Sequence, residues 1–386
     1  MTPSFPSKLP QVGTTIFTVM SQLAAEKNAV NLGQGFPDFP CDPALIQHVT
    51  QAMNDGHNQY PQMPGILPLR EAIATKIRAL HAHEYSAAAD ITITAGATQG
   101  ILTAILAVVH AGDEVIVLEP CYDSYVPNIE LAGGVAVRVA LKPGTFRPDF
   151  IKIAAAITLK TRAIVINTPH NPSATVWSHA DMLALQDLLA PTRVVLISDE
   201  VYEHMVFDDK PHLSAARYPG LAARAFVVSS FGKTFHVTGW KIGFVAAPTS
   251  LMAEFRKVHQ FNVFTVNTPM QHAMARYLQN PAPYLDLPAF YQRKRDQFRE
   301  GLATKTRFQL MPCEGSYFQC VDYSDLPDLR DLNELAACQW LTTEIGVAAI
   351  PLSAFYGAGF EQRTLRFCFA KQDDTLHLAL QRLAKL

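Results

Sequence analysis

Residues 163–200 read AIVINTPHNPSATVWSHADMLALQDLLAPTRVVLISDE and contain a strand, a helix and a second strand in succession. Ala163–Asn167 and Val194–Ser198 are continuous apolar runs, as expected of strands that are buried on both faces. Ser178–Leu189 between them is typical of a helix. This order predicts two parallel strands in a sheet that is covered by helices.

The same alternation extends on both sides, from about residue 90 to about residue 275. Five more candidate strands are Ile91–Thr94, Glu114–Leu118, Val135–Val139, Phe226–Ser229 and Ile242–Ala246. Beyond this region the sequence is more charged, and helix and strand signals mix. We therefore expect an α/β fold with a mainly parallel seven-stranded sheet in a large domain at 41–275. A smaller α+β domain is expected at 276–386, with an N-terminal arm at 1–40 that joins it.

Length and charge indicate a two-domain protein that binds small molecules. A chain of 386 residues is too long for one ordinary hydrophobic core, because domains cluster at roughly 100 to 200 residues. The net charge is −2, and Lys and Arg are scattered along the chain. This pattern is untypical of proteins that bind nucleic acid or a membrane surface.

Cysteine usage and the N-terminus predict a cytoplasmic protein. The six cysteines contain no C-x-x-C pair and no histidine spacing suited to zinc, so we expect reduced thiols and no metal site. Prolines in MTPSFPSKLP, residues 1–10, interrupt the apolar run that a signal peptide needs. The longest apolar stretches are too short to span a membrane.

Ligands of open parallel sheets collect outside the carboxyl ends of the strands, so residues that follow a strand are the first candidates for a site. The first such segment is TAGATQG, residues 94–100, where a strand breaks at Gly96 and a helix begins. Backbone N–H groups at a helix start bind anions. Taken alone, however, this short glycine motif favours a plain tight turn.

The second segment is NTPHNPSAT, residues 167–175, which follows a buried strand. Pro169 and Pro172 predict a rigid loop, and either X-Pro bond can be cis. The loop would aim Asn167 and Asn171 at a fixed point, where an amide can hydrogen-bond a phenolic oxygen of a ligand. The alternative is a turn in which Asn caps the backbone.

The third segment is VVLISDEVYEHM, residues 194–205, in which an apolar strand ends at Asp199 and Glu200. An acid at this point either caps the next helix or serves as a buried counter-ion. A buried carboxylate persists only beside a cation, and a protonated pyridine nitrogen is a suitable one. Tyr202, three residues beyond Asp199, is placed to reach the same ligand.

The fourth segment is FVVSSFGKTFHVTGWKIGF, residues 226–244, in which a strand leads through Ser230 to Lys233. A loop lysine is normally a solvated surface charge. Lys233 instead lies among Phe, Ser, Gly, Thr and Trp, and Lys241 follows it. Serine hydroxyls and a second cation suit a phosphate, and a neighbouring cation with partial burial lowers the lysine pKa, as a nucleophilic amine requires.

Together these segments resemble the fold-type I aminotransferases, which use pyridoxal 5'-phosphate. The resemblance covers nearly the whole chain and is greatest to the branch of kynurenine/glutamine aminotransferases and bacterial methionine aminotransferases. It rests on NLGQGFPDFP, NQYPQMPGILPLREAIA, NTPHNP, SDEVYE, SSFGKTFHVTGWKIGF and LRFCFA. Each of these sequence segments alone is unspecific, but their order and spacing along the chain are specific to the family.

The resemblance implies roles for the residues around the cofactor. Lys233 would hold it as a Schiff base, and Asp199 would pair with the pyridine nitrogen. Asn171 and Tyr202 would bind the ring hydroxyl, and Tyr122 would stack on the ring. The phosphate would be held by Gly96, Ala97, Thr98, Ser230 and Lys241.

Further residues are implied at the substrate and subunit contacts. Arg366 would bind the substrate carboxylate, with Gly35 and Asn171 adding contacts. Phe17 is a candidate pocket wall, although ordinary helix packing is the favoured explanation for it. Tyr60 is expected to reach the phosphate bound by a neighbouring subunit, which implies a homodimer with shared active sites.

One position departs from the family pattern. Many members carry arginine where this chain has Lys241, and lysine is a point charge without the planar fork of arginine. Lys241 is also a rival of Lys233 for the covalent link. Lys233 is preferred because it directly follows the strand end and the serine-glycine turn.

The resemblance implies ping-pong transfer of an amino group from an L-amino acid to a 2-oxo acid. Methionine, aromatic residues or glutamine are the expected donors, since no second basic residue demands a dicarboxylate. A cysteine-S-conjugate β-lyase shares the same early steps and remains an alternative. A non-catalytic cofactor-binding regulator and a nicotinamide enzyme are weaker alternatives, because an effector domain and a G-x-G-x-x-G loop are missing.

Overall fold

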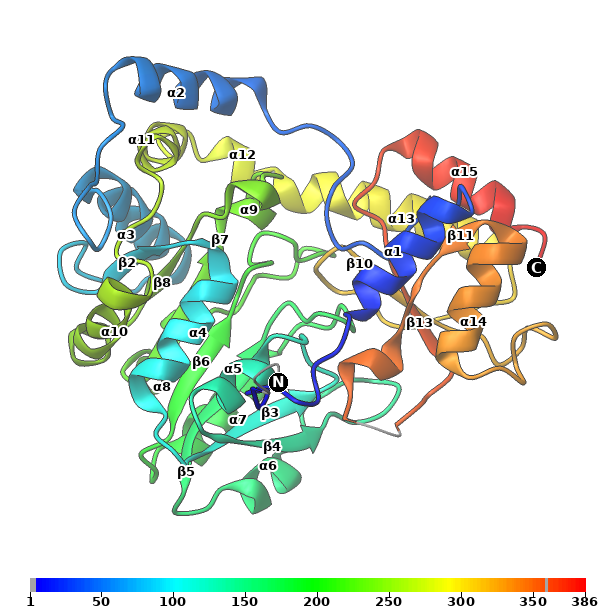
Figure 1. The fold of residues 1–386 in the computed structure, drawn as a ribbon, viewed down its shortest axis with the longest axis horizontal. Helices are drawn as coiled ribbons and strands as arrows, with labels where there is room; N and C mark the ends of the chain where they lie inside the picture. The colour runs from blue at the N-terminus through cyan, green and yellow to red at the C-terminus, as the bar shows by residue number, and fades with distance from the viewer. Residues whose placement is uncertain (1–4, 358–359) are drawn as a thin grey trace.

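The computed structural model describes residues 5–357 and 360–386 and is built around one seven-stranded sheet (Figure 1). In their order across the sheet, the strands are β2 (Ile91–Thr94), β8 (Gly243–Ala246), β7 (Ala225–Ser230), β6 (Val195–Asp199), β5 (Thr161–Asn167), β3 (Glu114–Glu119) and β4 (Val135–Ala140). Only β8 runs antiparallel to its neighbours. The predicted mainly parallel sheet is thus confirmed, with strand ends that shift by two residues or fewer.

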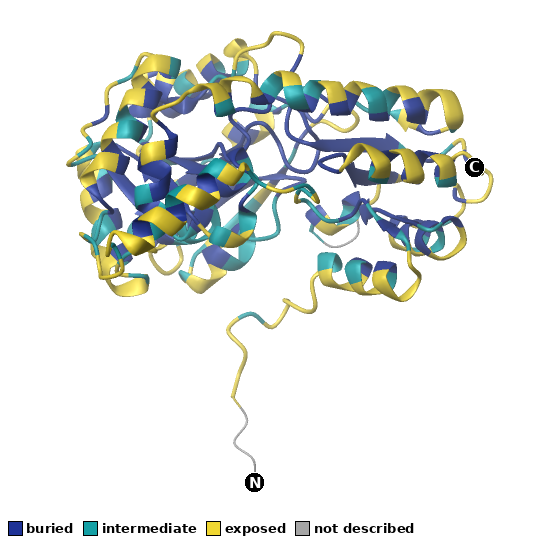
Figure 2. Cartoon of the chain, turned by 90° about the horizontal axis from the view of Figure 1, so that it is seen from above, coloured by how far each residue is buried: buried dark blue, intermediate teal, exposed yellow. Residues whose placement is uncertain are grey.

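Two apolar clusters cover the two faces of this sheet, because successive residues of a strand point to opposite faces. In β3, Val115 and Val117 belong to one cluster, and Ile116 and Leu118 to the other. The first cluster includes side chains of α4 (Gly96–Val108), α5 (Tyr125–Leu131) and α10 (Thr249–Asn262). The second includes side chains of α3 (Leu67–His81), α6 (Phe150–Ala156), α7 (His179–Leu189), α8 (Pro219–Ala222) and α11 (Thr268–Tyr277). Figure 2 shows the buried strands inside the body and exposed residues on the outward sides of the helices.

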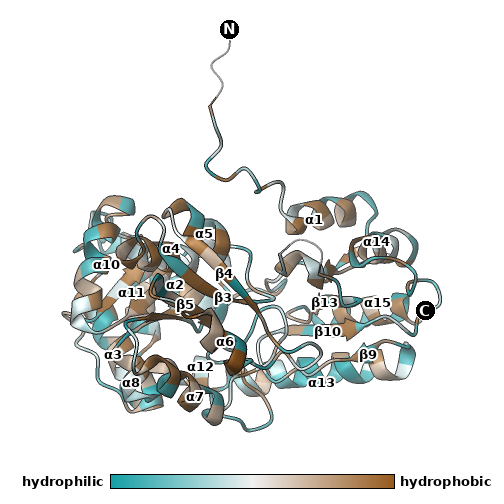
Figure 3. Ribbon diagram, turned by 90° about the horizontal axis from the view of Figure 1, so that it is seen from below, coloured by the Kyte–Doolittle hydropathy of each residue, from teal (hydrophilic) through white to brown (hydrophobic). Residues whose placement is uncertain are grey.

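A second, smaller group of strands lies beside the large sheet (Figure 1). Its antiparallel sheet has the order β12 (Ile350–Pro351), β13 (Thr364–Cys368), β10 (Phe318–Asp322) and β9 (Gln309–Leu310). Its helices are α1 (Ile16–Glu26), α13 (Leu287–Lys305), α14 (Glu334–Trp340) and α15 (Asp373–Leu383). β1 (Val30–Asn31) pairs in parallel with β11 (Val347–Ala348), so residues near the N-terminus complete this C-terminal unit. Ahead of α1, residues 5–14, nearly all of them exposed, extend away from the body (Figures 2 and 3).

Local sequence signals explain how several helices begin. α7 starts with a capping box, in which the Ser178 hydroxyl and the Asp181 carboxylate each accept a hydrogen bond from the other residue's backbone N–H. Thr15 caps α1 in the same general way. α4 differs, because Ala95 stands at its N-cap and offers no side-chain acceptor. The first N–H groups of α4 are therefore free of a side-chain cap.

The six cysteines are all free thiols, and five of them are buried. Within the described ranges, no helix is both long and apolar enough to cross a membrane. Figure 3 shows the apolar residues concentrated on the strands and on the sides of the helices that face them, which agrees with burial in a protein core.

The strand β8 approaches the start of α4 and the end of β7 closely at Gly243. A Cβ atom at this position would lie 2.6 Å from the Ser229 carbonyl oxygen and 3.3 Å from the Gly96 carbonyl carbon. Both neighbours are backbone atoms, which cannot rotate away as a side chain can. Glycine is therefore required for the contact between β8, β7 and α4.

We expect Gly243→Ala to lower the free energy of unfolding by about 1–3 kcal/mol, because overpacking against backbone forces the strands apart. The matched control is Gly239→Ala, where an added Cβ would meet nothing within 4 Å, with an expected change within about 0.5 kcal/mol. Urea unfolding of the two variants measures the difference. Equal midpoints would show that β8 can move without loss.

Candidate active site

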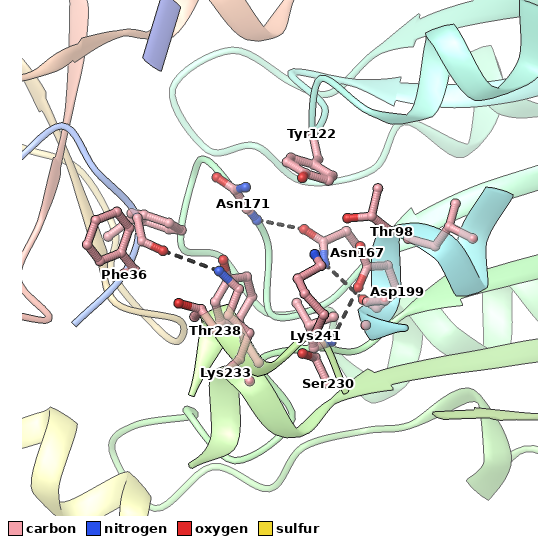
Figure 4. Close-up of a pocket in the computed structure, with 18 of the residues that line it drawn as sticks. Phe36, Thr98, Tyr122, Asn167, Asn171, Asp199, Ser230, Lys233, Thr238 and Lys241 are labelled. Carbon is pink, nitrogen blue, oxygen red and sulfur yellow. Dashed lines mark hydrogen bonds between the residues drawn. The ribbon is translucent and has the colours of Figure 1, made fainter. Parts of the chain in front are cut away.

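A cavity of about 250 Å³ lies at the carboxyl ends of the central parallel strands and reaches the smaller unit (Figure 4). The residues predicted from the sequence that line it are Phe17, Gly35, Gly96, Ala97, Thr98, Tyr122, Asn171, Asp199, Tyr202, Ser230, Lys233, Lys241 and Arg366. Residues from distant parts of the chain therefore meet at one place. The fold brings them together because parallel strands end at the same edge of the sheet.

One end of this cavity is suited to an anion. Gly96 begins α4 with a φ of +76°, a backbone conformation that glycine adopts readily, and the helix start carries no side-chain cap. The Lys241 amine lies beside Gly96, since a Cβ at Gly96 would be 3.5 Å from its Nζ. Ser230 and Thr98 line the same cavity. Free backbone N–H groups, hydroxyls and one cation form a donor set that fits a phosphate.

Lys233 lies in α9 (Phe231–Thr234), one short turn after the end of β7. Its Nζ donates hydrogen bonds to the Tyr317 hydroxyl at 3.0 Å and to the Gly35 carbonyl at 3.2 Å. Burial is the main cause that lowers the pKa of Lys233 to about 8, and the positive charge of Arg366 adds to it. A substantial fraction of this amine is thus neutral near pH 7 to 8, as a nucleophile or base requires.

Asp199 is the last residue of β6, and its side chain is buried. Its Oδ2 accepts a hydrogen bond from the Tyr125 hydroxyl at 2.6 Å, and its Oδ1 accepts one from the backbone N–H of Val201 at 3.3 Å. Burial outweighs these hydrogen bonds and raises the pKa of Asp199 to about 6. A cationic partner in the cavity would stabilise the carboxylate. This environment fits a protonated ring nitrogen.

The alternative role of Asp199 as a helix cap is wrong. Residues 201–204 form a turn, and the next helical element begins only at Ala215. Tyr202 therefore reaches the cavity from a turn that follows β6, without an intervening helix. In the neighbouring loop, both the Thr168–Pro169 bond and the Asn171–Pro172 bond are cis.

The opposite end of the cavity presents a buried guanidinium. Arg366, in the centre of β13, donates to the Asn171 side-chain oxygen at 2.7 Å and to the Gly33 carbonyl at 3.0 Å. Its Cζ lies 4.0 Å from the ring centroid of Phe318 and 5.4 Å from that of Phe17. Within the described residues its Nε has no hydrogen-bond partner. This group can bind a carboxylate, and Phe17 is part of the cavity wall as well as of α1.

Tyr60 is the one predicted site residue that does not line this cavity. It lies on the surface with 83% of its area exposed, and its ring is 5.4 Å from that of Phe264. Phe261, three residues before Phe264 in the sequence, is also 86% exposed. A single chain leaves these aromatic groups uncovered, so the expected contact of Tyr60 with a neighbouring subunit stays a prediction.

Sequence reasoning missed three aromatic residues that shape the site. Tyr125 holds Asp199, Tyr317 holds Lys233, and Phe318 stacks on Arg366. Tyr125 ends the segment EPCYDSY, residues 119–125, in which only Tyr122 was assigned a role from the sequence. The pair YF at 317–318 follows Ser316 at the start of β10, but no local pattern distinguishes it from core residues.

Two buried acids, Glu200 and Glu203, hold the chain that follows Asp199 and contains Tyr202. Glu203 accepts hydrogen bonds from the Lys76 amine at 2.6 Å and from the Ser229 hydroxyl. Glu200 accepts one from the Ala215 backbone at 2.9 Å, and its carboxylate lies 2.8 Å from His212 Nε2. The charge of Lys76 and the neighbouring histidines hold the pKa of Glu203 well below its usual range, against the effect of burial. These contacts attach the residues that follow β6 to Ser229 in β7, to Lys76 in α3 and to Ala215.

Comparison with known proteins identifies relatives over the full length of the chain. A family model described as aminotransferase class I and II matches residues 27–383. Methionine aminotransferase of Escherichia coli strain K12 is 50% identical over 381 residues, covering 98% of both chains. Human kynurenine–oxoglutarate transaminase 1 is 35% identical over 396 residues, covering 94% of both. A crystal structure of an Escherichia coli protein identified as a methionine aminotransferase superposes with a TM-score of 0.97, at 50% identity and full coverage of both chains.

We expect Lys76→Met to lower the free energy of unfolding by about 3–5 kcal/mol, because it leaves the Glu203 carboxylate buried without its cation. Lys257→Met removes an exposed lysine from a surface pair with Glu254 and should change stability by less than about 1 kcal/mol. Urea midpoints at pH 7 compare the variants. A midpoint of Lys76→Met equal to that of Lys257→Met would contradict a stabilising role of the buried Lys76–Glu203 pair.

The same pair gives a pH dependence with a definite sign. The folded-state pKa of Glu203 lies below the ordinary value of 4.5, so its contribution to stability is complete above that pH and is lost as the pH falls further. The stability difference between the wild type and Lys76→Met should therefore shrink below pH 4.5.

Proposed function

The chain belongs to the class I and II aminotransferase family, and we propose that the cavity around Lys233 is its active site. Members of the family use pyridoxal phosphate, so the chain is a pyridoxal-phosphate-dependent aminotransferase that acts on amino acids and 2-oxo acids. The observation that carries the assignment of the site is the meeting of Lys233, Asp199 and an anion-binding helix start in one cavity.

The residues of this cavity divide into groups that fit the parts of the cofactor. Lys233 is proposed to form the covalent link, and Asp199 to hold the proton on the ring nitrogen. Asn171 and Tyr202 are proposed to bind the ring hydroxyl, and Tyr122 to stack on the ring. The proposed phosphate ligands are Gly96, Ala97, Thr98, Ser230 and Lys241. Lys241 supports the phosphate role because its amine lies beside Gly96 at the start of α4.

The mechanism follows from the properties of these side chains. When bound, pyridoxal phosphate accepts the electron pair that remains when the substrate Cα loses its proton. The amine of Lys233, with its pKa lowered to about 8, is the base that takes this proton and later returns it. The Asp199 carboxylate keeps a proton on the ring nitrogen, and Arg366 holds the substrate carboxylate. Transfer proceeds in two half-reactions, with the amino group retained between them.

We propose methionine and similar apolar amino acids as the preferred donors. A relative with 50% identity is a methionine aminotransferase of Escherichia coli, and the cavity wall near Arg366 is aromatic. The rings of Phe17 and Phe318 flank the Arg366 guanidinium, and Phe36 lines the same cavity. Such a wall favours thioether and aromatic side chains over a second carboxylate.

The assembly and location of the protein are further proposals. A homodimer would cover the exposed aromatic residues Tyr60, Phe261 and Phe264 and bring Tyr60 to a second active site. A cytoplasmic location fits six free cysteines. We also propose a large domain at 41–275 and a small domain at 276–386 joined by residues 1–40, which the pairing of β1 with β11 supports.

The identity of the linking lysine is tested with Lys233→Ala and its matched control Lys241→Ala. Lys233→Ala should lack the absorbance band of the lysine-bound cofactor and lose activity by at least about 100- to 10,000-fold. Lys241→Ala should keep the band but bind pyridoxal phosphate about 10- to 100-fold more weakly, because one charged contact is lost. Borohydride reduction and peptide mass spectrometry locate the linked lysine. Attachment at Lys241 in the wild type would refute the assignment.

Donor preference is tested by steady-state kinetics with methionine, phenylalanine, glutamine and aspartate and a common 2-oxo acid. We expect kcat/KM for methionine to exceed that for aspartate by about 100-fold or more, because a second carboxylate would be buried against aromatic rings without a partner. A higher kcat/KM for aspartate would reject the proposed specificity.

A further inference from the structure

The hydroxyl of Tyr317 has an unusual position, in direct contact with the amine of Lys233. Tyr317 is fully buried and precedes β10 in the smaller unit. Its hydroxyl donates to the Gly35 carbonyl oxygen at 2.6 Å. The Lys233 amine donates to the Tyr317 oxygen at 3.0 Å and to the Gly35 oxygen at 3.2 Å. Figure 4 shows the bond from Lys233 to the chain beside Phe36.

These three contacts fix the direction of each hydrogen. The single hydroxyl proton of Tyr317 is used for Gly35, so the Tyr317 oxygen acts as an acceptor toward Lys233. A neutral amine has two N–H bonds and one lone pair. When both N–H bonds point to the oxygens of Tyr317 and Gly35, the lone pair is directed away from them. A base abstracts a proton only with this lone pair.

We propose that Tyr317 is a positioning residue that orients the Lys233 amine, so that its lone pair faces the substrate side of the cavity. This inference rests on the proposed role of Lys233 as the proton-transferring lysine. Tyr317 acts through Lys233 and needs no contact with the substrate. The second acceptor is the backbone carbonyl of Gly35, which no side-chain substitution removes. Of the two acceptors of the Lys233 amine, only the Tyr317 hydroxyl can therefore be tested by substitution.

The surroundings of Tyr317 make it a rigid support. Its ring packs edge-on against Tyr202 at 5.1 Å and Phe318 at 4.9 Å, and at a tilt against Tyr291 at 5.8 Å. Close packing on these sides and the hydrogen bond to Gly35 restrict the movement of the Tyr317 side chain and so hold its hydroxyl in place. The charged and titratable groups that face the Lys233 amine are Asp199, Arg366, Lys241, Cys368, Tyr202 and Tyr317.

The matched pair for a test is Tyr317→Phe and Tyr291→Phe. Both changes remove one buried hydroxyl from neighbouring rings, but the Tyr291 hydroxyl has no hydrogen-bond partner within the described parts of the chain. Tyr291→Phe should therefore retain wild-type kinetics. Tyr317→Phe should lower kcat by about 10- to 100-fold with little change in KM, since orientation is lost while substrate binding remains. The isotope effect on kcat with α-deuterated methionine should rise, because proton transfer becomes slower.

A second readout uses cofactor-free protein and requires no turnover. The rate at which pyridoxal phosphate attaches to Lys233 follows the neutral fraction of its amine, so the pH profile reports the pKa of Lys233. The Tyr317 oxygen stabilises the ammonium form, and its removal should shift the profile to lower pH by about one unit. The profile of Tyr291→Phe should coincide with that of the wild type. A merely structural role of Tyr317 would leave this profile in place.

Amine rescue separates the inference from the proposed function. In Lys233→Ala, added methylamine replaces the lysine as base, and Tyr317→Phe in that background should leave the rescued rate within about twofold. A further loss of about tenfold or more would show that Tyr317 acts independently of Lys233 and would overturn the inference. Wild-type behaviour of Tyr317→Phe would also overturn it, while the role of Lys233 would stand. If Lys233→Ala retained a covalently attached cofactor, the proposed role of Lys233 and the inference would both fall.

Discussion

The parallel register of β5, β6 and β7 is the constraint on which the site depends. Asn167 at the end of β5 pairs with Asp199 at the end of β6, and Asp199 pairs with Val228, two residues before the end of β7. The residues at the ends of these neighbouring strands therefore lie together at one edge of the sheet. The Asn167 amide also donates to the Asp199 carbonyl at 2.8 Å, which ties the two strand ends together. A shift by one residue would turn Asp199 to the opposite face.

Much of the large domain could be predicted because its signals are local. Several buried strands are continuous apolar runs, and Gly, Pro, Asn or Asp marks most of the strand ends. The seven strands of the large sheet and the Ser178 helix start could be predicted in this way. The cavity residues Asn171, Asp199 and Lys233 follow the same rule, since Asp199 is the last residue of β6 and the other two stand shortly after β5 and β7.

The parts that escaped prediction depend on contacts between distant segments. Tyr317 meets Gly35 across 282 positions of the chain, and Arg366 meets Gly33 across 333. Tyr317 and Phe318 appear in the sequence as two more apolar residues at a strand start, and nothing nearby distinguishes a hydroxyl that contacts the Lys233 amine from one in a core. The helix-cap interpretation of Asp199 failed for a related reason, because the turn after β6 is held by Lys76 and His212 from other elements.

Burial acts on the acid and the base of this site in opposite directions. Removal from water disfavours every charged form, so it raises the pKa of Asp199 to about 6 and lowers that of Lys233 to about 8. Within one cavity, burial therefore favours the uncharged forms of both the carboxyl group and the amine. Lys233 gains a usable lone pair, and Asp199 becomes a carboxylate that a cationic ring would stabilise strongly. A solvent-exposed lysine with the same neighbours in sequence would remain protonated, so the lowered pKa of Lys233 depends on its enclosure, to which the rings of Tyr202 and Tyr317 contribute.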